Sequence, residues 1–375
     1  MLDQENIIDN IKSEQDDNYA DDSIFNITSW GADLSFRELI TMYKDGDLLK
    51  PEIQRHYVWD KVEASFFIDS ILLGLPLPSI FLAKTKSENL LIVDGFQRIM
   101  TVYDYVNGIF SKDKKTFKLS KISRINSRWS GKAFAELDDS EQKRIKNTTI
   151  HSIIFSQIHP KSGDTSLYQI FERINTSGRT LFPQEIRNCV YQGVFNKALI
   201  ELNKLPTWRK LYGLESTDSR MRDIEFILRY FALNSSYFHE LNVTTISLKK
   251  FLNDYMEFGN NFEGKIIEEK KAEFASLVQF IYDILGQNAF RNLSNTKDKH
   301  YSTKFSPTIF DSIMIASFYF KRENLPINKQ NIKNNHQKLL QNTEYIEATT
   351  THTTNLEVIQ RRIKLASDIL FGAQK

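Results

Sequence analysis

One short segment brings a carboxylate, a glycine, an amide and a guanidinium together in the order Asp94-Gly95-Phe96-Gln97-Arg98. Glycine permits a tight turn, and the first turn of a following helix offers unpaired N–H groups to an anion. Arg98 can contribute a forked contact to phosphate oxygens, and Asp94 can hold a divalent cation or orient water. We therefore expect phosphate recognition here, with Asp94, Gln97 and Arg98 as candidate catalytic residues and Asp94 as a candidate metal ligand.

A purely structural role explains the same residues. Asp94 would then cap the following helix, and Arg98 would pair with a neighbouring carboxylate. The sequence of this segment alone leaves both interpretations open.

A second polar motif, residues 54–59, precedes a segment with helical periodicity. Gln54 and Arg55 supply hydrogen-bond donors, while Tyr57 and Trp59 supply aromatic faces. This combination suits a base and its phosphates, although the same rings would also serve as packing over the core.

A third polar motif runs from residue 171 to residue 188. Arg173 and Asn175 lie at the end of one expected helix and Arg187 lies on the next, so all three can point into one crevice. A tight corner between two helices, held by an internal Arg–Glu network, explains these residues nearly as well.

Basic residues gather between residues 112 and 132, with Phe117 and Trp129 interleaved. Clustered cations release counterions when they bind a polyanion, so this segment is a candidate contact for a nucleic-acid backbone. A solvated charged loop is the alternative. The candidate nucleic-acid contacts are Lys114, Lys115, Lys118, Lys121, Arg124 and Arg128.

The elements around the first motif follow from apolar spacing. Residues 79–83 and 90–93 are short apolar runs joined by a polar turn, which predicts two paired strands. Apolar side chains then recur at helical spacing from Ile99 to Val106, and Gly108 ends that helix. The motif is therefore expected at a turn between a strand and a helix.

Other helices are indicated by their ends. Ser35 with Glu38 and Asp60 with Glu63 have the spacing of capping boxes, and Pro183 suits a first helical turn. Residues 149–155 form a further expected strand. Beyond them nearly every periodic segment predicts helix, including 220–233, 246–258, 264–285, 307–322 and 355–371.

These elements predict an α+β protein with two packed units. Residues 1–25 are rich in Asp and Glu and are expected to be a disordered acidic arm. Residues 26–195 are expected to form an αβ domain and residues 196–375 a mostly helical domain. The boundary rests only on the change of pattern.

Composition excludes several classes of protein. The single cysteine, Cys189, rules out disulfide scaffolds and multi-cysteine zinc sites. No apolar run reaches the roughly 18 residues of a membrane span, and the first residues are too acidic for a signal peptide, so a cytoplasmic protein is expected. The formal net charge of +2 predicts no partner by itself. There is no Walker A loop and no His-Glu-x-x-His motif.

The three motifs, in this order, resemble the N-terminal domain of GmrSD-type, modification-dependent restriction endonucleases. The matching segments are residues 51–59, the helix end at 70–78, residues 94–98 and residues 171–188. The resemblance is strong over residues 30–195 and fainter through 220–233 and 248–256.

This resemblance implies a ParB/sulfiredoxin-like fold and a nucleotide-binding, NTP-hydrolysing module of bacterial defence against phage or foreign DNA. It implies a nucleoside triphosphate with Mg²⁺ as ligand. The nucleotide-binding residues that it implies, beside Asp94, Gln97 and Arg98, are Gln54, Arg55, Tyr57, Gly95, Thr101, Arg173, Asn175 and Arg187.

The sequence departs from the family pattern at two positions, where Phe96 replaces a usual glutamine and Phe182 a usual helix-capping serine. Phe96 removes one amide from the pocket entrance, so nucleotide binding is a firmer expectation than hydrolysis. Larger relatives append a His-Asn-His nuclease domain. His336 and His352 lack the compact setting of such a site, so no built-in His-Asn-His nuclease is expected, and a nuclease of that type would be a separate partner. Two alternatives stay open: a DNA-binding protein that uses the basic segment, and a metal-dependent nuclease in the αβ domain.

Overall fold

The computed structural model describes residues 8, 26–50, 59–85, 88–159, 165–174, 182–241, 243–294, 300–324 and 326–372. The chain divides into two compact units. We call the described residues between 22 and 180, with Asn188–Val190, the sheet unit. The described residues of 1–21, 181–187 and 191–375 form the helical unit. The predicted acidic arm lies outside the described residues except for Ile8, and the predicted boundary at residue 195 stays a prediction.

The sheet unit is built on one mixed five-stranded sheet with the order β1-β5-β3-β4-β2. β1 pairs with β5 and β3 with β4 in antiparallel fashion, whereas β3 with β5 and β2 with β4 are parallel. The strands are β1 (Asn26–Ser35), β2 (Leu48–Leu49), β3 (Ile80–Lys84), β4 (Leu90–Asp94) and β5 (Thr149–His159).

Five helices and one 3₁₀ turn belong to this unit in the described part of the chain: α1 (Phe36–Asp45), α2 (Lys61–Leu73), α3 (Phe96–Asn107), η3 (Phe134–Glu136), α4 (Asp139–Asn147) and α5 (Thr165–Ile174). Both predicted capping boxes are present, at Ser35 for α1 and at Asp60 for α2. Left-handed glycines end α1, α2 and α3, because only glycine adopts that conformation without strain.

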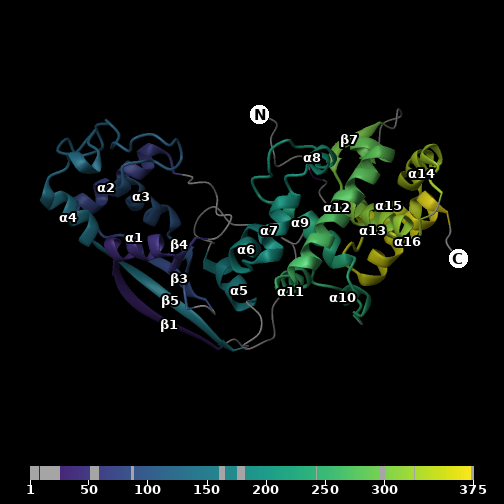
Figure 1. The fold of residues 1–375 in the computed structure, drawn as a ribbon, viewed down its shortest axis with the longest axis horizontal. Helices are drawn as coiled ribbons and strands as arrows, with labels where there is room; N and C mark the ends of the chain where they lie inside the picture. The colour runs from purple at the N-terminus through teal and green to yellow at the C-terminus, as the bar shows by residue number, and fades with distance from the viewer. Residues whose placement is uncertain are drawn as a thin grey trace. The chain divides into compact units, whose positions relative to one another are not determined.

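The helices α1 to α4 gather on one side of the strands (Figure 1). Side chains of β5 alternate accordingly, with Ile150, Ser152 and Ile154 buried and His151 exposed. One continuous apolar core joins α1, α2 and α3 to the inner face of the sheet. β4, the strand that carries Asp94, thus lies between β3 and β2 in the sheet and packs one face against this core.

The helical unit contains one two-stranded sheet and helices in the residues that the structure describes. Its elements are α7 (Val194–Leu202), α8 (Pro206–Tyr212), α9 (Arg222–Leu233), α10 (Ser236–His239), α11 (Leu248–Gly259), α12 (Gly264–Leu285), η5 (Gly286–Asn288), β6 (Arg291–Leu293), β7 (Tyr301–Phe305), α13 (Pro307–Arg322), α14 (Lys329–Gln341), α15 (Thr343–Thr350) and α16 (Leu356–Phe371), together with the part of α6 (Pro183–Val190) up to Arg187. Its centre is aromatic: Trp208 is fully buried and packs against Phe274, Phe305 and Phe310.

The predicted α+β class is confirmed, with a mixed sheet in the first half of the chain and helices in the second. Several elements differ from the sequence expectations. β1, β2 and α4 were not predicted, and the short strands β6 and β7 lie between the predicted helices 264–285 and 307–322. In the part of the chain that is described, no helix combines the length and apolar character needed to cross a membrane.

Candidate functional site

The turn between β4 and α3 requires glycine on two grounds. Gly95 has a φ of 101°, which lies in the left-handed region. A Cβ placed on it would lie 2.3 Å from Cγ2 of Ile80, the first residue of the neighbouring strand β3. Gly95 is also the N-cap of α3, and it brings no side-chain hydrogen bond to the first turn of that helix. The N-cap of α3 therefore supplies no side-chain acceptor to the N–H groups of the first turn.

Asp94 and Arg98 form one hydrogen-bonded unit beside this turn. Nη2 of Arg98 lies 3.0 Å from Oδ2 of Asp94, and the two side chains are 18% and 41% exposed. Nη1 of Arg98 donates to the carbonyls of Pro78 and Ser79 at 3.1 and 2.6 Å. Arg98 thus ties α3 to the chain that enters β3, and it orients one oxygen of a carboxylate that solvent can still reach.

The sheet is irregular next to Asp94. Asp94 pairs with Phe81 across β3 and β4, and the register shifts between Phe81 and Leu82. Irregularities of this kind re-aim side chains at the ends of strands. Of the two purely structural roles that the sequence suggested, one is present, because Arg98 pairs with a carboxylate. The other is not, because Gly95 and not Asp94 is the N-cap of α3.

The two other polar residues of α3 have different settings. Oε1 of Gln97 accepts a hydrogen bond from the backbone N–H of Trp59 at 3.3 Å. Thr101 is fully buried, and its hydroxyl donates to the carbonyl of Gln97 at 2.7 Å. Gln97 therefore connects the first turn of α3 to the end of the second polar motif, whereas Thr101 lies in the interior.

Four predicted site residues lie outside the described residues. They are Gln54, Arg55 and Tyr57 of the second motif and Asn175 of the third. Arg173 is exposed in the last turn of α5. Arg187 is fully buried in the helical unit, where Nε donates to Oδ1 of Asn253 at 2.8 Å and Nη1 to Oε1 of Gln184 at 3.0 Å. Nucleotide binding by these residues stays a prediction.

The structure separates the cations of the basic segment into two groups. Nζ of Lys118 lies 2.8 Å from Oε1 of Glu136, and Nε of Arg128 lies 2.6 Å from Oε1 of Glu141. Within the described residues, no carboxylate lies within ion-pair distance of the four other candidates, all of which are exposed: Lys114, Lys115, Lys121 and Arg124.

Asp104 anchors the beginning of this segment from α3. Its carboxylate accepts hydrogen bonds from the backbone N–H and the hydroxyl of Ser111 at 2.7 and 2.6 Å. Burial raises the pKa of the Asp104 carboxyl, while the Ser111 hydrogen bonds and the charge of Lys114 act in the opposite direction. The basic segment is thus attached to the core at its first residues.

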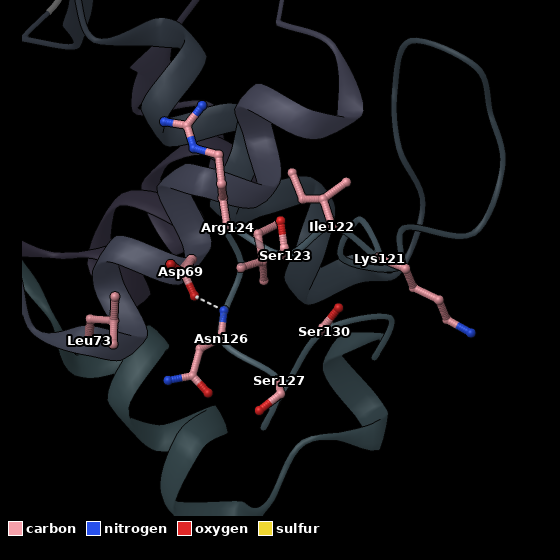
Figure 2. Close-up of a pocket in the computed structure, with 10 residues that line it drawn as sticks. Asp69, Leu73, Lys121, Ile122, Ser123, Arg124, Asn126, Ser127 and Ser130 are labelled. Carbon is pink, nitrogen blue, oxygen red and sulfur yellow. Dashed lines mark hydrogen bonds between the residues drawn. The ribbon is translucent and has the colours of Figure 1, made fainter.

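Part of the basic segment lines an open pocket of about 800 Å³ (Figure 2). Oδ1 of Asp69, on α2, accepts hydrogen bonds from Nε1 of Trp129 at 2.6 Å and from the backbone N–H of Asn126 at 3.2 Å. Lys121 and Arg124 extend from the same loop in different directions (Figure 2). The pocket is lined by Asp69, Leu73, Ile125, Ser130 and residues 121–124, 126 and 127.

Sequence reasoning missed Asp69 and the small polar residues of this pocket. A signal existed, because Asp69 is an acidic residue among the apolar positions of α2 and Trp129 is an indole that needs an acceptor when buried. Which acceptor meets which donor depends on tertiary structure, and the sequence does not contain that pairing.

The described residues contain no group of three or more His, Cys, Asp or Glu side chains arranged to hold a metal ion. Cys189 is buried in α6, as expected for a helical cysteine. His336 is buried in the helical unit, with Nε2 3.1 Å from the carbonyl of Ala289 and Nδ1 3.2 Å from the Tyr301 hydroxyl. Burial lowers the pKa of His336 to about 4.

Comparison with known proteins bears on the sheet unit. No curated protein and no solved structure matches the chain. The family model described as the GmrSD restriction endonuclease N-terminal domain matches residues 36–192. This segment contains the β4–α3 turn, the basic segment and the helix that carries Arg187, so it includes the elements that the sequence motifs singled out. Residues 36–192 belong to the family of GmrSD restriction endonuclease N-terminal domains.

Proposed function

We propose that residues 36–192 bind a nucleoside triphosphate at the β4–α3 turn and serve as the nucleotide-operated part of a restriction-type defence system. The family to which this segment belongs supports the defence context. The observation that carries the nucleotide proposal is the glycine-capped beginning of α3, which lies beside the partly exposed carboxylate of Asp94.

The backbone supplies the phosphate contacts in this proposal. A helix of 12 residues begins at Phe96, and its cap provides no side-chain oxygen to its first N–H groups. N–H groups in the first turn of a helix and the positive end of the helix dipole favour an anion at this position.

Asp94 fits the role of a ligand to a nucleotide-bound Mg²⁺ ion. Magnesium in nucleotide sites is commonly held by one or two carboxylates, and phosphate oxygens and water complete its octahedron. A single protein carboxylate can therefore hold a nucleotide-bound Mg²⁺ ion. When bound, the ion would neutralise phosphate charge and orient a water molecule.

Arg98 acts first as a positioning residue in this scheme. Its guanidinium fixes Oδ2 of Asp94 and two carbonyls before β3, so the carboxylate and the turn keep their geometry. Gln97 holds the backbone of Trp59 and so keeps the end of the second motif beside α3. The family resemblance adds Gln54, Arg55 and Tyr57 of that motif as contacts to the nucleotide.

The family resemblance implies three further features, which are part of this proposal. They are hydrolysis of the nucleotide, a ParB/sulfiredoxin-like fold and a separate nuclease partner. Phe96 is half-buried and packs against the core where the family usually has glutamine. One amide is therefore missing beside the proposed phosphate site. We expect nucleotide binding to be retained and the rate of hydrolysis to be low.

The test is calorimetric titration of the full chain with ATP, GTP, CTP and UTP in the presence of Mg²⁺. Arg98→Ala should weaken binding of the preferred nucleotide by at least about tenfold, because Asp94 and the turn lose a charge-assisted support. Asp94→Asn should retain the contact with Arg98 but lose most of the dependence of binding on Mg²⁺. Release of inorganic phosphate measures hydrolysis in parallel.

Arg37→Ala is the matched control, because Arg37 is an exposed arginine on α1 that contacts only Asn147 among described residues. It should bind nucleotide like the wild type. Thermal unfolding of each variant separates a local effect from loss of the fold. Equal affinity of wild type and Arg98→Ala, or no binding of any nucleotide to the wild type, would overturn the proposal.

A further inference from the structure

We propose that the pocket between α2 and the basic segment is a second site, which binds the phosphodiester backbone of a nucleic acid through Lys121 and Arg124. This inference goes beyond the proposed nucleotide site, because it concerns other residues and a polymeric ligand. The pocket volume of about 800 Å³ is large enough for several atoms of a sugar-phosphate chain.

The charge of the segment points to an anion. Eight basic residues lie between 112 and 132 and a single acidic one, Asp113, which pairs with Lys61 at 3.1 Å. Lys118 and Arg128 are held by carboxylates, as described above. Lys121 and Arg124 are the two basic residues that line the pocket, and neither makes an ion pair with any residue that the structure describes.

Both cations are placed by packing that leaves their donors accessible. The guanidinium of Arg124 lies 4.8 Å from the centre of the Phe66 ring. Stacking uses the face of a guanidinium, so its N–H groups remain free at the edge for the two oxygens of a phosphate. The stem of Lys121 crosses Gly131, where a Cβ would lie 2.5 Å from its Cε. A side chain at residue 131 would displace Lys121.

Neutral donors also line this pocket. Ser123, Asn126 and Ser127 are exposed, and their hydroxyl and amide N–H groups donate to no residue in the described part of the chain. Oδ1 of Asn126 already accepts from the backbone N–H of Arg128 at 3.0 Å, which directs its amide nitrogen elsewhere. Hydroxyls, an amide and two cations are the groups that contact sugar and phosphate in nucleic-acid complexes.

The loop that carries these groups is fixed to the core, so the site is formed in advance. Backbone hydrogen bonds join Leu119 to Lys132 at 3.0 Å and Gly131 to Leu119 at 3.1 Å. Asp69 is the single acidic residue of the lining, and it is buried with Oδ1 engaged by Asn126 and Trp129. Its Oδ1 therefore holds the loop in place.

The experiment measures fluorescence anisotropy of the full chain with labelled duplex DNA, single-stranded DNA and single-stranded RNA of one length, without nucleotide. Affinity is followed against salt concentration. Joint substitution of Lys121→Gln and Arg124→Gln should weaken the best-bound polymer about tenfold at low salt and lower the log–log salt slope by about 2 for a duplex. The three polymers distinguish the possible sources of the backbone.

Two further variants make the result specific. Lys333→Gln with Lys338→Gln removes the same charge from exposed positions of α14 and should leave affinity unchanged. Ser127→Glu adds a carboxylate to the pocket without removing a cation and should weaken binding, whereas Ser127→Gln should not.

The proposal is overturned if none of the three polymers binds at low salt. It is also overturned if the α14 control loses as much affinity as the pocket variant, or if Ser127→Glu binds like the wild type. Asp94→Asn should bind the polymer normally, so failure of the nucleotide site and failure of this site are measured separately.

Discussion

The two units use their basic side chains in opposite ways. In the helical unit Arg187, Arg209, Arg229, Arg291 and Arg362 are buried. In the sheet unit, every Lys and Arg side chain for which the structure describes burial is at least partly exposed, and the buried charged residues are the acids Asp69, Asp104 and Glu141. Basic side chains are therefore part of the interior of the helical unit, whereas in the sheet unit they lie at or near the surface.

The buried arginines of the helical unit have internal partners. Arg229 on α9 and Arg362 on α16 both bind the carboxylate of Asp311 on α13, with Nε of Arg229 3.1 Å from Oδ1 and Nη2 of Arg362 3.1 Å from Oδ2. Nη1 of Arg209 lies 2.7 Å from Oδ2 of Asp223. These buried ion pairs connect helices. An arginine that is already paired in the interior is not placed to bind a ligand.

This contrast predicts that Asp311→Ala has the largest effect on stability of any change considered for this chain. The substitution leaves two guanidinium groups buried without their carboxylate, and breaking a buried ion pair costs about 3–5 kcal/mol. Urea unfolding followed by circular dichroism measures the loss.

Glu269→Ala is the matched control for Asp311→Ala, because it removes an exposed carboxylate 3.9 Å from Lys265 in the same unit. It should leave the unfolding midpoint unchanged within error. If Asp311→Ala were equally mild, the idea that the helical unit depends on its buried charges would be wrong.

The second prediction concerns the dependence of stability on pH that His336 confers on the helical unit. The pKa of His336 is about 4 in the folded chain and about 6.5 when unfolded. Between these values the unfolded chain binds the proton and the folded chain does not. The contribution is therefore complete above pH 6.5 and falls by about 3 kcal/mol as the pH drops to 4.

His336→Gln removes this titration and keeps an N–H donor for the carbonyl of Ala289. As the pH falls from 6.5 to 4, the unfolding free energy of the wild type should decrease more than that of the variant. A difference that stays constant over this range would show that His336 is not held neutral in the folded chain.

The third prediction tests whether the candidate site of the sheet unit depends on backbone geometry. Gly95→Ala places a Cβ on a residue with left-handed backbone and brings it to 2.3 Å from Ile80. Together these two effects should lower the free energy of unfolding by about 3 kcal/mol. Gly46→Ala has a similar φ of 85° with nothing within 4 Å, and should cost about 1 kcal/mol. Thermal unfolding compares the two, and equal losses would mean that the close approach to Ile80 is not a constraint.

The sequence predicted the β4–α3 turn well because its determinants are local. The apolar run before Asp94, the glycine and the helical spacing from Ile99 onward all lie within a few residues of one another. The predicted helices 264–285 and 307–322 likewise agree with α12 and α13 at both ends. Local signals mark these ends, since Pro307 occupies the first turn of α13 and Gly286 follows the last residue of α12.

The strands that were missed lack such local determinants. β1 is an edge strand whose ten residues pair with β5 through the backbone, while Trp30 is 43% exposed and Gly31 and Asp33 are poor strand formers. β6 has three residues, which is shorter than any window in which alternation can be recognised. In both cases backbone pairing with another strand, distant β5 for β1 and the following β7 for β6, creates the strand, and the side-chain pattern does not.

The contacts of the site were predictable only in part for the same reason. Pairing of Arg98 with a carboxylate was one of two interpretations, and the spacing of four residues to Asp94 on the chain permits it. The carbonyls of Pro78 and Ser79, which Arg98 also binds, lie about twenty residues away in sequence. The acceptor for Trp129 is 60 residues away on α2. Sequence patterns identify donors but not their distant acceptors.

The fourth prediction has the smallest expected effect and concerns Asp60, an exposed aspartate of the sheet unit that can be compared with the buried Asp311. Oδ1 of Asp60 accepts hydrogen bonds from the backbone N–H groups of Val62 and Glu63 at 2.8 and 2.9 Å and so caps α2. Asp60→Ala should cost about 1 kcal/mol, and Asp60→Ser, which retains a cap, only a few tenths. Both losses are measurable by urea unfolding, and they should be well below that of Asp311→Ala because solvent replaces the lost acceptor at an exposed helix end but not in a buried ion pair.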